Sequence, residues 1–162
     1  MSEKQPYVKQ NIAKGVGYIE FFHPAHNSLP GDVLAKLANT ISDAGQNDDI
    51  KVIVLKSGGD RTFCAGASFN ELININDAAT GKVFFSGFAK VINAMRKCPK
   101  FIIGRIQGKT VGGGLGLAAS TDYCMGTING VPDVTFPITA AGPTTVTWTY
   151  DDGNGNTTTQ TQ

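Results

Sequence analysis

Apolar residues in the first 126 positions follow two alternating patterns: short continuous runs and longer stretches with helical periodicity. The β-prone runs at 16–22, 51–56 and 101–106 predict strands. Residues 30–44 and 82–97 repeat apolar side chains every three or four positions, which predicts two amphipathic helices. Strands that alternate with helices in this order predict an α/β layered fold.

The residues from 127 onward follow a different pattern. Segments 134–138 and 144–150 alternate apolar and polar side chains with a period of two, which predicts strands, and 151–156 is rich in turn-forming Asp, Gly and Asn. This part of the chain contains three Asp residues and no Lys or Arg. We therefore expect a main part at 1–126 and a short β-rich tail at 127–162.

Composition narrows the classes of function. The 162 residues suit one domain, or one domain with a fragment, and the formal net charge of +1 gives no electrostatic reason to bind nucleic acid or an acidic membrane surface. No apolar run is long enough to cross a bilayer. Cys64, Cys98 and Cys124 are widely spaced, which favours neither a disulfide framework nor a metal site. We expect three buried fillers and a reducing, cytoplasmic location.

Two segments rich in small residues carry the candidate chemistry, 61–69 and 111–117. Glycines at 113 and 114 let the main chain approach a ligand and precede a short apolar helix with unpaired N–H groups at its start. Two N–H groups that face one point form an oxyanion hole, here the N–H groups of Ala67 and Gly113 around a thioester carbonyl. The alternative is a tight turn or close helix–sheet packing. The glycines do not match G-x-G-x-x-G, so a dinucleotide site is not expected.

Segments 63–68 and 106–117, closing with Thr-Asp-Tyr-Cys at 121–124, resemble the enoyl-CoA hydratase/isomerase (crotonase) superfamily. His-Asn-Ser-Leu at 26–29 is similar to the family's early Asn-containing turn. The resemblance covers the chain from about residue 8 to about residue 126 and implies the crotonase-like fold, a repeated ββα spiral.

The resemblance also implies a ligand and a site. The family's two oxyanion donors fall on Ala67 and Gly113, and no metal or separate cofactor is implied, because the coenzyme A thioester is the substrate. Members act as hydratases or isomerases in fatty acid or branched-chain amino acid catabolism, some on methylglutaconyl-CoA, and are usually trimer-based homo-oligomers. The residues implied to line the acyl-CoA site are Ala65, Gly66, Ala67, Ser68, Phe69, Asn70 and Gly113.

The chain departs from the family at its carboxylates. Many hydratases of the family carry Glu where this chain has Gly116, and the family's other catalytic Glu lies beyond 127, where this chain is expected to leave the pattern together with the later helices and the trimer interface. Water addition needs a carboxylate to move protons. Glu71 is the nearest acid to the loop and the acid/base candidate, the alternative being a solvated helix residue. We therefore expect weak or no turnover, with a non-catalytic acyl-CoA binding module as the alternative.

The tail resembles repeats of bacterial surface proteins with immunoglobulin-like or HYR-type sandwiches, through Phe-Pro at 136–137 and the segment 146–156. This resemblance implies a chimeric chain that joins a truncated crotonase part to a fragment of a surface repeat. A structural role as such a fragment is therefore a further alternative function.

Overall fold

The computed structural model describes residues 5–126, 130–132, 147–151 and 157–161. The chain divides into two compact units, Met1–Gly126 and Thr127–Gln162. The first unit holds both segments rich in small residues. In the part of the chain that the structure describes, no helix is long and apolar enough to cross a membrane.

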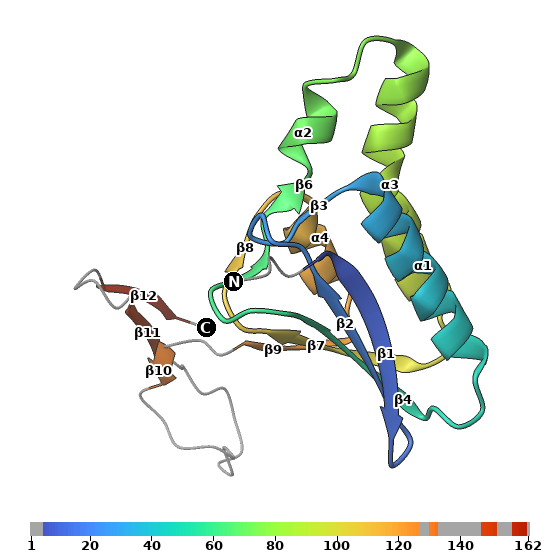
Figure 1. Ribbon diagram of the computed structural model, residues 1–162. Helices are drawn as coiled ribbons and strands as arrows, with labels where there is room; N and C mark the ends of the chain where they lie inside the picture. Colours follow the sequence, from blue (N-terminus) through green and yellow to red (C-terminus); the bar gives the residue numbers. More distant parts are fainter. Residues whose placement is uncertain (1–4, 127–129, 133–146, 152–156, 162) are drawn as a thin grey trace. The chain divides into compact units, whose positions relative to one another are not determined.

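A five-stranded sheet forms the base of the first unit, in the order β1-β2-β4-β7-β9 (Figure 1). Only β1 runs antiparallel to its neighbour, and the other pairs are parallel. The three predicted strands are present, whereas β1 and β9 were not predicted. The strands are β1 (Tyr7–Ala13), β2 (Val16–Phe22), β4 (Val52–Ser57), β7 (Phe101–Ile106) and β9 (Tyr123–Gly126).

Strand β1 escaped prediction because it has no apolar face of its own. Val8 is its single buried residue, and the exposed positions that follow show no apolar alternation. The strand is fixed instead by a tight turn to β2, in which Lys14 and Gly15 both take positive φ angles of 51° and 78°. Two positive φ angles are the geometry of the short turns that suit antiparallel hairpins.

Helices α1 (Gly31–Gln46) and α3 (Ala78–Lys97) run alongside each other and cover one side of the sheet (Figure 1). Leu37 and Ile41 of α1 are buried in the same core as Ile19, Ile53 and other inward side chains of β2, β4 and β7. This alternation of buried and less buried residues along the strands is expected when helices cover one face.

Helix α3 begins four residues before the predicted start at 82. Asp77 and Thr80 form a capping box there: the Thr80 N–H donates to the Asp77 carboxylate at 2.7 Å, and the Asp77 N–H donates to the Thr80 hydroxyl at 3.3 Å. A capping box pairs N–H groups that would otherwise lack acceptors. The start of this helix is marked by the polar residues Asp77 and Thr80, so the repeat of apolar residues did not predict it.

The second unit contains a three-stranded antiparallel sheet in the order β10-β11-β12. Its strands are β10 (Gly130–Pro132), β11 (Thr147–Asp151) and β12 (Thr157–Thr161). Strand β11 lies within and just beyond the segment predicted at 144–150. The strand predicted at 134–138 and the turn residues 152–156 lie outside the described residues.

Candidate functional site

One of two short strand pairs brings the two small-residue segments together. Strand β3 (Ser28–Leu29) pairs with β6 (Gly66–Ala67), and β5 (Thr62–Cys64) pairs with β8 (Lys109–Thr110). All four strands were missed in the sequence because each is two or three residues long. The second pair places the segment after β5 beside the segment after β8.

The two segments are in contact, and the positive φ angle of Gly66 at this contact favours glycine. Gly66 has a φ of +92°, and a Cβ at this position would lie 3.4 Å from the Val111 carbonyl oxygen and 3.9 Å from the Gly113 nitrogen. Across the same contact the Val111 N–H donates to the Cys64 carbonyl at 2.9 Å. The main chain around Ala67 and the main chain around Gly113 therefore face each other.

Gly114 has a packing role. A Cβ on Gly114 would lie 2.7 Å from the Cys64 carbonyl oxygen and 2.6 Å from the Cys64 Cβ. This is the close packing that the sequence left open as an alternative, and it applies to Gly114. Cys64 is a buried filler, as expected, and burial raises the pKa of its thiol to about 11. Cys98 is half-buried and Cys124 is exposed, so the expectation of three buried fillers was wrong.

Gly113 is the first residue of α4 (Gly113–Ala119), and its N–H has no acceptor within that helix. Leu117 and Ala118 are buried and anchor the helix in the core. A Cβ on Gly113 would lie 2.5 Å from the Phe88 ring of α3. The Gly113 N–H is thus held at one position by packing on both sides.

The segment that carries Ala67 is held by hydrogen bonds. The Ser28 hydroxyl donates to the Ala67 carbonyl at 2.9 Å, and the Ser68 N–H donates to the Leu29 carbonyl at 3.0 Å. Ser68 is buried and caps the short helix α2 (Phe69–Leu72), whereas Phe69 and Asn70 are exposed. Of the implied acyl-CoA residues, 65–68 are therefore buried or half-buried, and 69 and 70 face outward.

The Glu71 carboxylate lies at the start of helix α1. Its Oε1 and Oε2 atoms accept from the Gly31 N–H at 3.0 and 2.9 Å. The N-cap of α1 is Pro30, which offers no side-chain acceptor, so Glu71 supplies the cap from a distant part of the chain. Glu71 also lines a hollow of about 660 Å³ with Asn70 of α2, Ile75 of the following loop, Val83 of α3 and other residues.

Three further acids of the first unit, Glu20, Asp60 and Asp122, have partners or stand in solvent. Glu20 accepts from the Tyr7 hydroxyl and from the Lys56 ammonium group, both at 2.5 Å, and the hydrogen bond from Lys56 lowers its pKa most. Asp122 accepts from the Ile102 N–H at 2.8 Å, which pins the residues before β9 to β7. Asp60 is exposed. Where a family carboxylate was expected, the residue is the half-buried Gly116.

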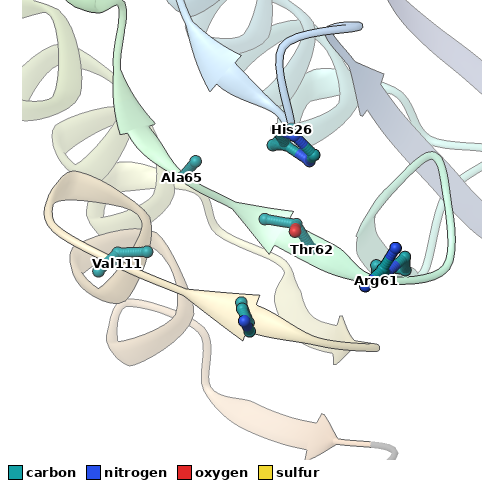
Figure 2. A pocket seen from close by; sticks show the side chains of 6 residues that line it. His26, Arg61, Thr62, Ala65 and Val111 are labelled. Atoms are coloured by element: carbon teal, nitrogen blue, oxygen red, sulfur yellow. The ribbon is translucent and has the colours of Figure 1, made fainter.

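A second hollow, of about 380 Å³, lies beside the contact between the two segments. Figure 2 shows Ala65 and Val111 on its facing walls, with Thr62, Arg61 and His26 farther along. Lys109 completes the lining. Arg61 and Lys109 give this hollow a positive character. No local sequence motif marks this pair, because the two residues lie 48 positions apart.

Buried amides fix the turn that leads into β5. The Asn27 side chain is 3% exposed, donates to the carbonyls of Gly58 and Thr62 at 2.9 and 2.8 Å, and accepts from the His23 N–H at 2.8 Å. The Gln107 amide donates to the Ser57 hydroxyl at 2.8 Å. Asn27 therefore fixes the shape of this turn without lining the hollow, whereas its neighbour His26 lines it. Within the described residues, no group of three His, Cys, Asp or Glu side chains is placed to hold a metal ion.

Comparison with protein families matches residues 11–143 to the enoyl-CoA hydratase/isomerase family. The chain belongs to the enoyl-CoA hydratase/isomerase family. The match continues past residue 126, near which the resemblance was expected to end. The mixed α/β fold of the first unit is the crotonase-like fold that the motifs implied.

Two curated relatives illustrate the likeness. The peroxisomal Δ(3,5)-Δ(2,4)-dienoyl-CoA isomerase of Arabidopsis thaliana is 28% identical over an alignment of 131 residues, and the match covers 72% of this chain and 47% of the relative. The mitochondrial methylglutaconyl-CoA hydratase of Rattus norvegicus is 31% identical over 96 residues, which are 59% of this chain and 30% of the relative. The chain therefore spans about half or less of the length of these curated relatives.

A solved family structure shows the same fold. The crystal structure of an enoyl-CoA hydratase from Bacillus anthracis matches with a TM-score of 0.68 at 23% identity, over 74% of this chain and 46% of that one. The immunoglobulin-like or HYR resemblance of 127–162 finds no support in these comparisons, and the family match includes the first part of that segment.

Proposed function

We propose that the first unit binds an acyl-CoA thioester with its carbonyl oxygen between the N–H groups of Ala67 and Gly113. The observation that carries this proposal is the close approach of two main-chain segments, in which a Cβ on Gly66 would lie 3.9 Å from the Gly113 nitrogen. Family membership supplies the ligand class, since the relatives named above are an acyl-CoA isomerase and an acyl-CoA hydratase. Donors aimed at a thioester oxygen stabilise the charge that develops there.

The positive hollow suits the polar end of such a ligand. Arg61, at the start of the first small-residue segment, and Lys109 of β8 line it beside Ala65 and Val111. Phosphate groups pair well with guanidinium and ammonium groups. In the proposed complex the coenzyme A phosphates lie toward Arg61 and Lys109, and the acyl group lies beyond the turn at 65–70.

Turnover is proposed to be weak or absent. Proton transfer at the α-carbon and at water needs a carboxylate within hydrogen-bond reach of the substrate. Glu20, Glu71 and Asp122 each hold a partner within the fold, and position 116 is glycine. The chain then polarises a thioester without moving its protons, which also describes the non-catalytic binding module.

Two further properties stay proposals. The odd, widely spaced cysteines favour the cytoplasmic location expected from the sequence. The trimer-based assembly of the family remains a prediction for this chain, and sedimentation at several protein concentrations measures it.

Calorimetric titration with a saturated acyl-CoA and with free coenzyme A tests the proposal. The informative pair is Gly113→Pro and Gly113→Ala. Both substitutions place a Cβ against the Phe88 ring, but proline, which suits the first position of a helix, removes the N–H, whereas alanine keeps it. We expect Gly113→Pro to bind the thioester about tenfold more weakly than Gly113→Ala, about 1.4 kcal/mol for one lost hydrogen bond.

Free coenzyme A separates the carbonyl from the rest of the ligand. It should bind both variants equally, because it has no thioester oxygen. A wild-type chain that is folded by circular dichroism yet gives no saturable binding of either ligand would sink the proposal. Addition of water to an unsaturated acyl-CoA, followed by absorbance, should show little or no turnover, and fast hydration would overturn the missing-carboxylate argument.

A further inference from the structure

Glu71 closes a ring of hydrogen bonds around the turn that follows Ala67. The Ser68 N–H donates to the Leu29 carbonyl at 3.0 Å, and the Glu71 N–H donates to the Ser68 hydroxyl at 3.4 Å. The Glu71 carboxylate then accepts from the Gly31 N–H, two residues after Leu29. The segment 68–71 is thereby fastened at both ends to the segment 29–31.

Glu71 connects two helices, α1 and α2, that have few other local contacts to hold their N-terminal ends. Helix α1 has no side-chain acceptor at its own N-cap, so its first N–H depends on Glu71. Helix α2 has four residues and no buried side chain of its own, so packing contributes little to its position. A carboxylate also suits the positive end of a helix dipole. One side chain therefore serves both helices.

We infer that Glu71 is a positioning residue: its carboxylate on the Gly31 N–H holds the turn at 65–68 so that the Ala67 N–H faces the thioester oxygen. This inference rests on the proposed function for its ligand, but the fastening itself concerns the ligand-free chain. It assigns Glu71 a role other than the acid/base role expected from the sequence. In that earlier role the carboxylate must reach the substrate, whereas here it needs only to accept a hydrogen bond.

Three variants of the full chain test the inference. Glu71→Ala removes the acceptor. Glu71→Gln keeps an acceptor oxygen at the same reach and loses the charge. Asp32→Ala is the matched control, because Asp32 is an exposed acid in the first turn of the same helix α1 and lies outside the ring of hydrogen bonds.

Amide hydrogen exchange of the ligand-free chain is the first measurement. We expect Glu71→Ala to speed exchange across 65–72 about tenfold, the order of effect of a lost helix cap. Glu71→Gln and Asp32→Ala should stay close to wild type. Unchanged exchange in Glu71→Ala, or equal acceleration in Asp32→Ala, would overturn the fastening.

The carbonyl stretching frequency of a bound saturated acyl-CoA, read by isotope-edited infrared spectroscopy, is the second measurement. Wild type and Glu71→Gln should lower this frequency equally, and Glu71→Ala should lower it less. If wild type binds no acyl-CoA or shows no shift, the proposed function fails, and the exchange pattern alone decides the fastening. If both Glu71 variants match wild type in exchange and in carbonyl shift yet lose any measured turnover, Glu71 is the acid/base residue and the positioning role is wrong.

Discussion

The loop that carries Ala67 is held by hydrogen bonds to the segment 28–31, whereas the loop that carries Gly113 is held by close packing. Ser28, Leu29 and Glu71 provide or anchor the polar contacts of the first loop. In the second loop, glycine hydrogens lie where a Cβ would meet Cys64 or the Phe88 ring. The first loop should thus respond to loss of polar groups and the second to gain of volume.

The strongest way to break this comparison is to add one carbon to the packed loop. We expect Gly114→Ala to lower the free energy of unfolding by about 3 kcal/mol, because its Cβ would lie 2.7 Å from a main-chain oxygen that no rotamer change can move. Urea unfolding measures the change. Gly81→Ala in α3 is the control: its Cβ would lie 3.5 Å from Ile75, and alanine should stabilise the helix by roughly 1 kcal/mol. A Gly114→Ala midpoint equal to wild type would show that the loop relaxes freely.

Loss of the buried Asn27 amide should cause the next largest loss of stability, because it removes hydrogen bonds of the turn that leads into β5. Asn27→Ala leaves the carbonyls of Gly58 and Thr62 and the His23 N–H without this partner, and it places alanine at a φ of 55°. Unpaired buried groups cost about 1 to 3 kcal/mol, so we expect a loss of about 2 kcal/mol with partial rescue by water. Asn27→Asp keeps the acceptor and loses the donors. If urea unfolding shows Asn27→Ala to be as stable as wild type, the hydrogen bonds of Asn27 do not stabilise the fold.

A smaller change acts on the Ala67 loop alone. Ser28→Ala removes the hydroxyl that donates to the Ala67 carbonyl and should cost about 1 kcal/mol in urea unfolding. Because Ala67 is the proposed donor residue, thioester binding should weaken more than binding of free coenzyme A. Ser42→Ala serves as the control, since that hydroxyl donates within helix α1 to the Ala38 carbonyl. Equal weakening of both ligands would mean that Ser28 acts on global stability only.

The sequence predicts the packed Gly113 loop more directly than it predicts the hydrogen bonds that hold the Ala67 loop. The glycine run at 112–114 and the small residues around Ala67 stand out as motifs, and the apolar runs locate the central strands and both long helices. Nothing local marks the bond between Glu71 and Gly31, because its partners lie 40 positions apart. The short strand pair β3–β6 and the positive hollow at Arg61 and Lys109 likewise exist only once the chain has folded.

The smallest expected effect comes from the titration of Glu20, a residue that lies outside both loops. The hydrogen bond from Lys56, with that from Tyr7, lowers the Glu20 pKa, so ionised Glu20 stabilises the fold above its unfolded pKa of about 4.3. This stability is lost as pH falls through the lowered pKa of the folded state. We expect Glu20→Gln to cost about 1 kcal/mol or less at neutral pH, and the difference from wild type to shrink below about pH 4.

Titration of Tyr7 tests the alkaline side of the same dependence of stability on pH. Burial, with the hydrogen bond to Glu20, raises the Tyr7 pKa to about 12, so its neutral form stabilises the fold up to about pH 10. That contribution disappears as pH rises through the folded pKa. Urea midpoints across pH should therefore fall at both ends in wild type, with a weaker acid limb in Glu20→Gln. Thioester affinity relative to free coenzyme A should stay constant in Glu20→Gln at neutral pH, because neither loop uses Glu20. A selective loss of thioester binding would mean that the two loops are coupled to the β1–β2 edge, and their separate modes of support would no longer explain the site.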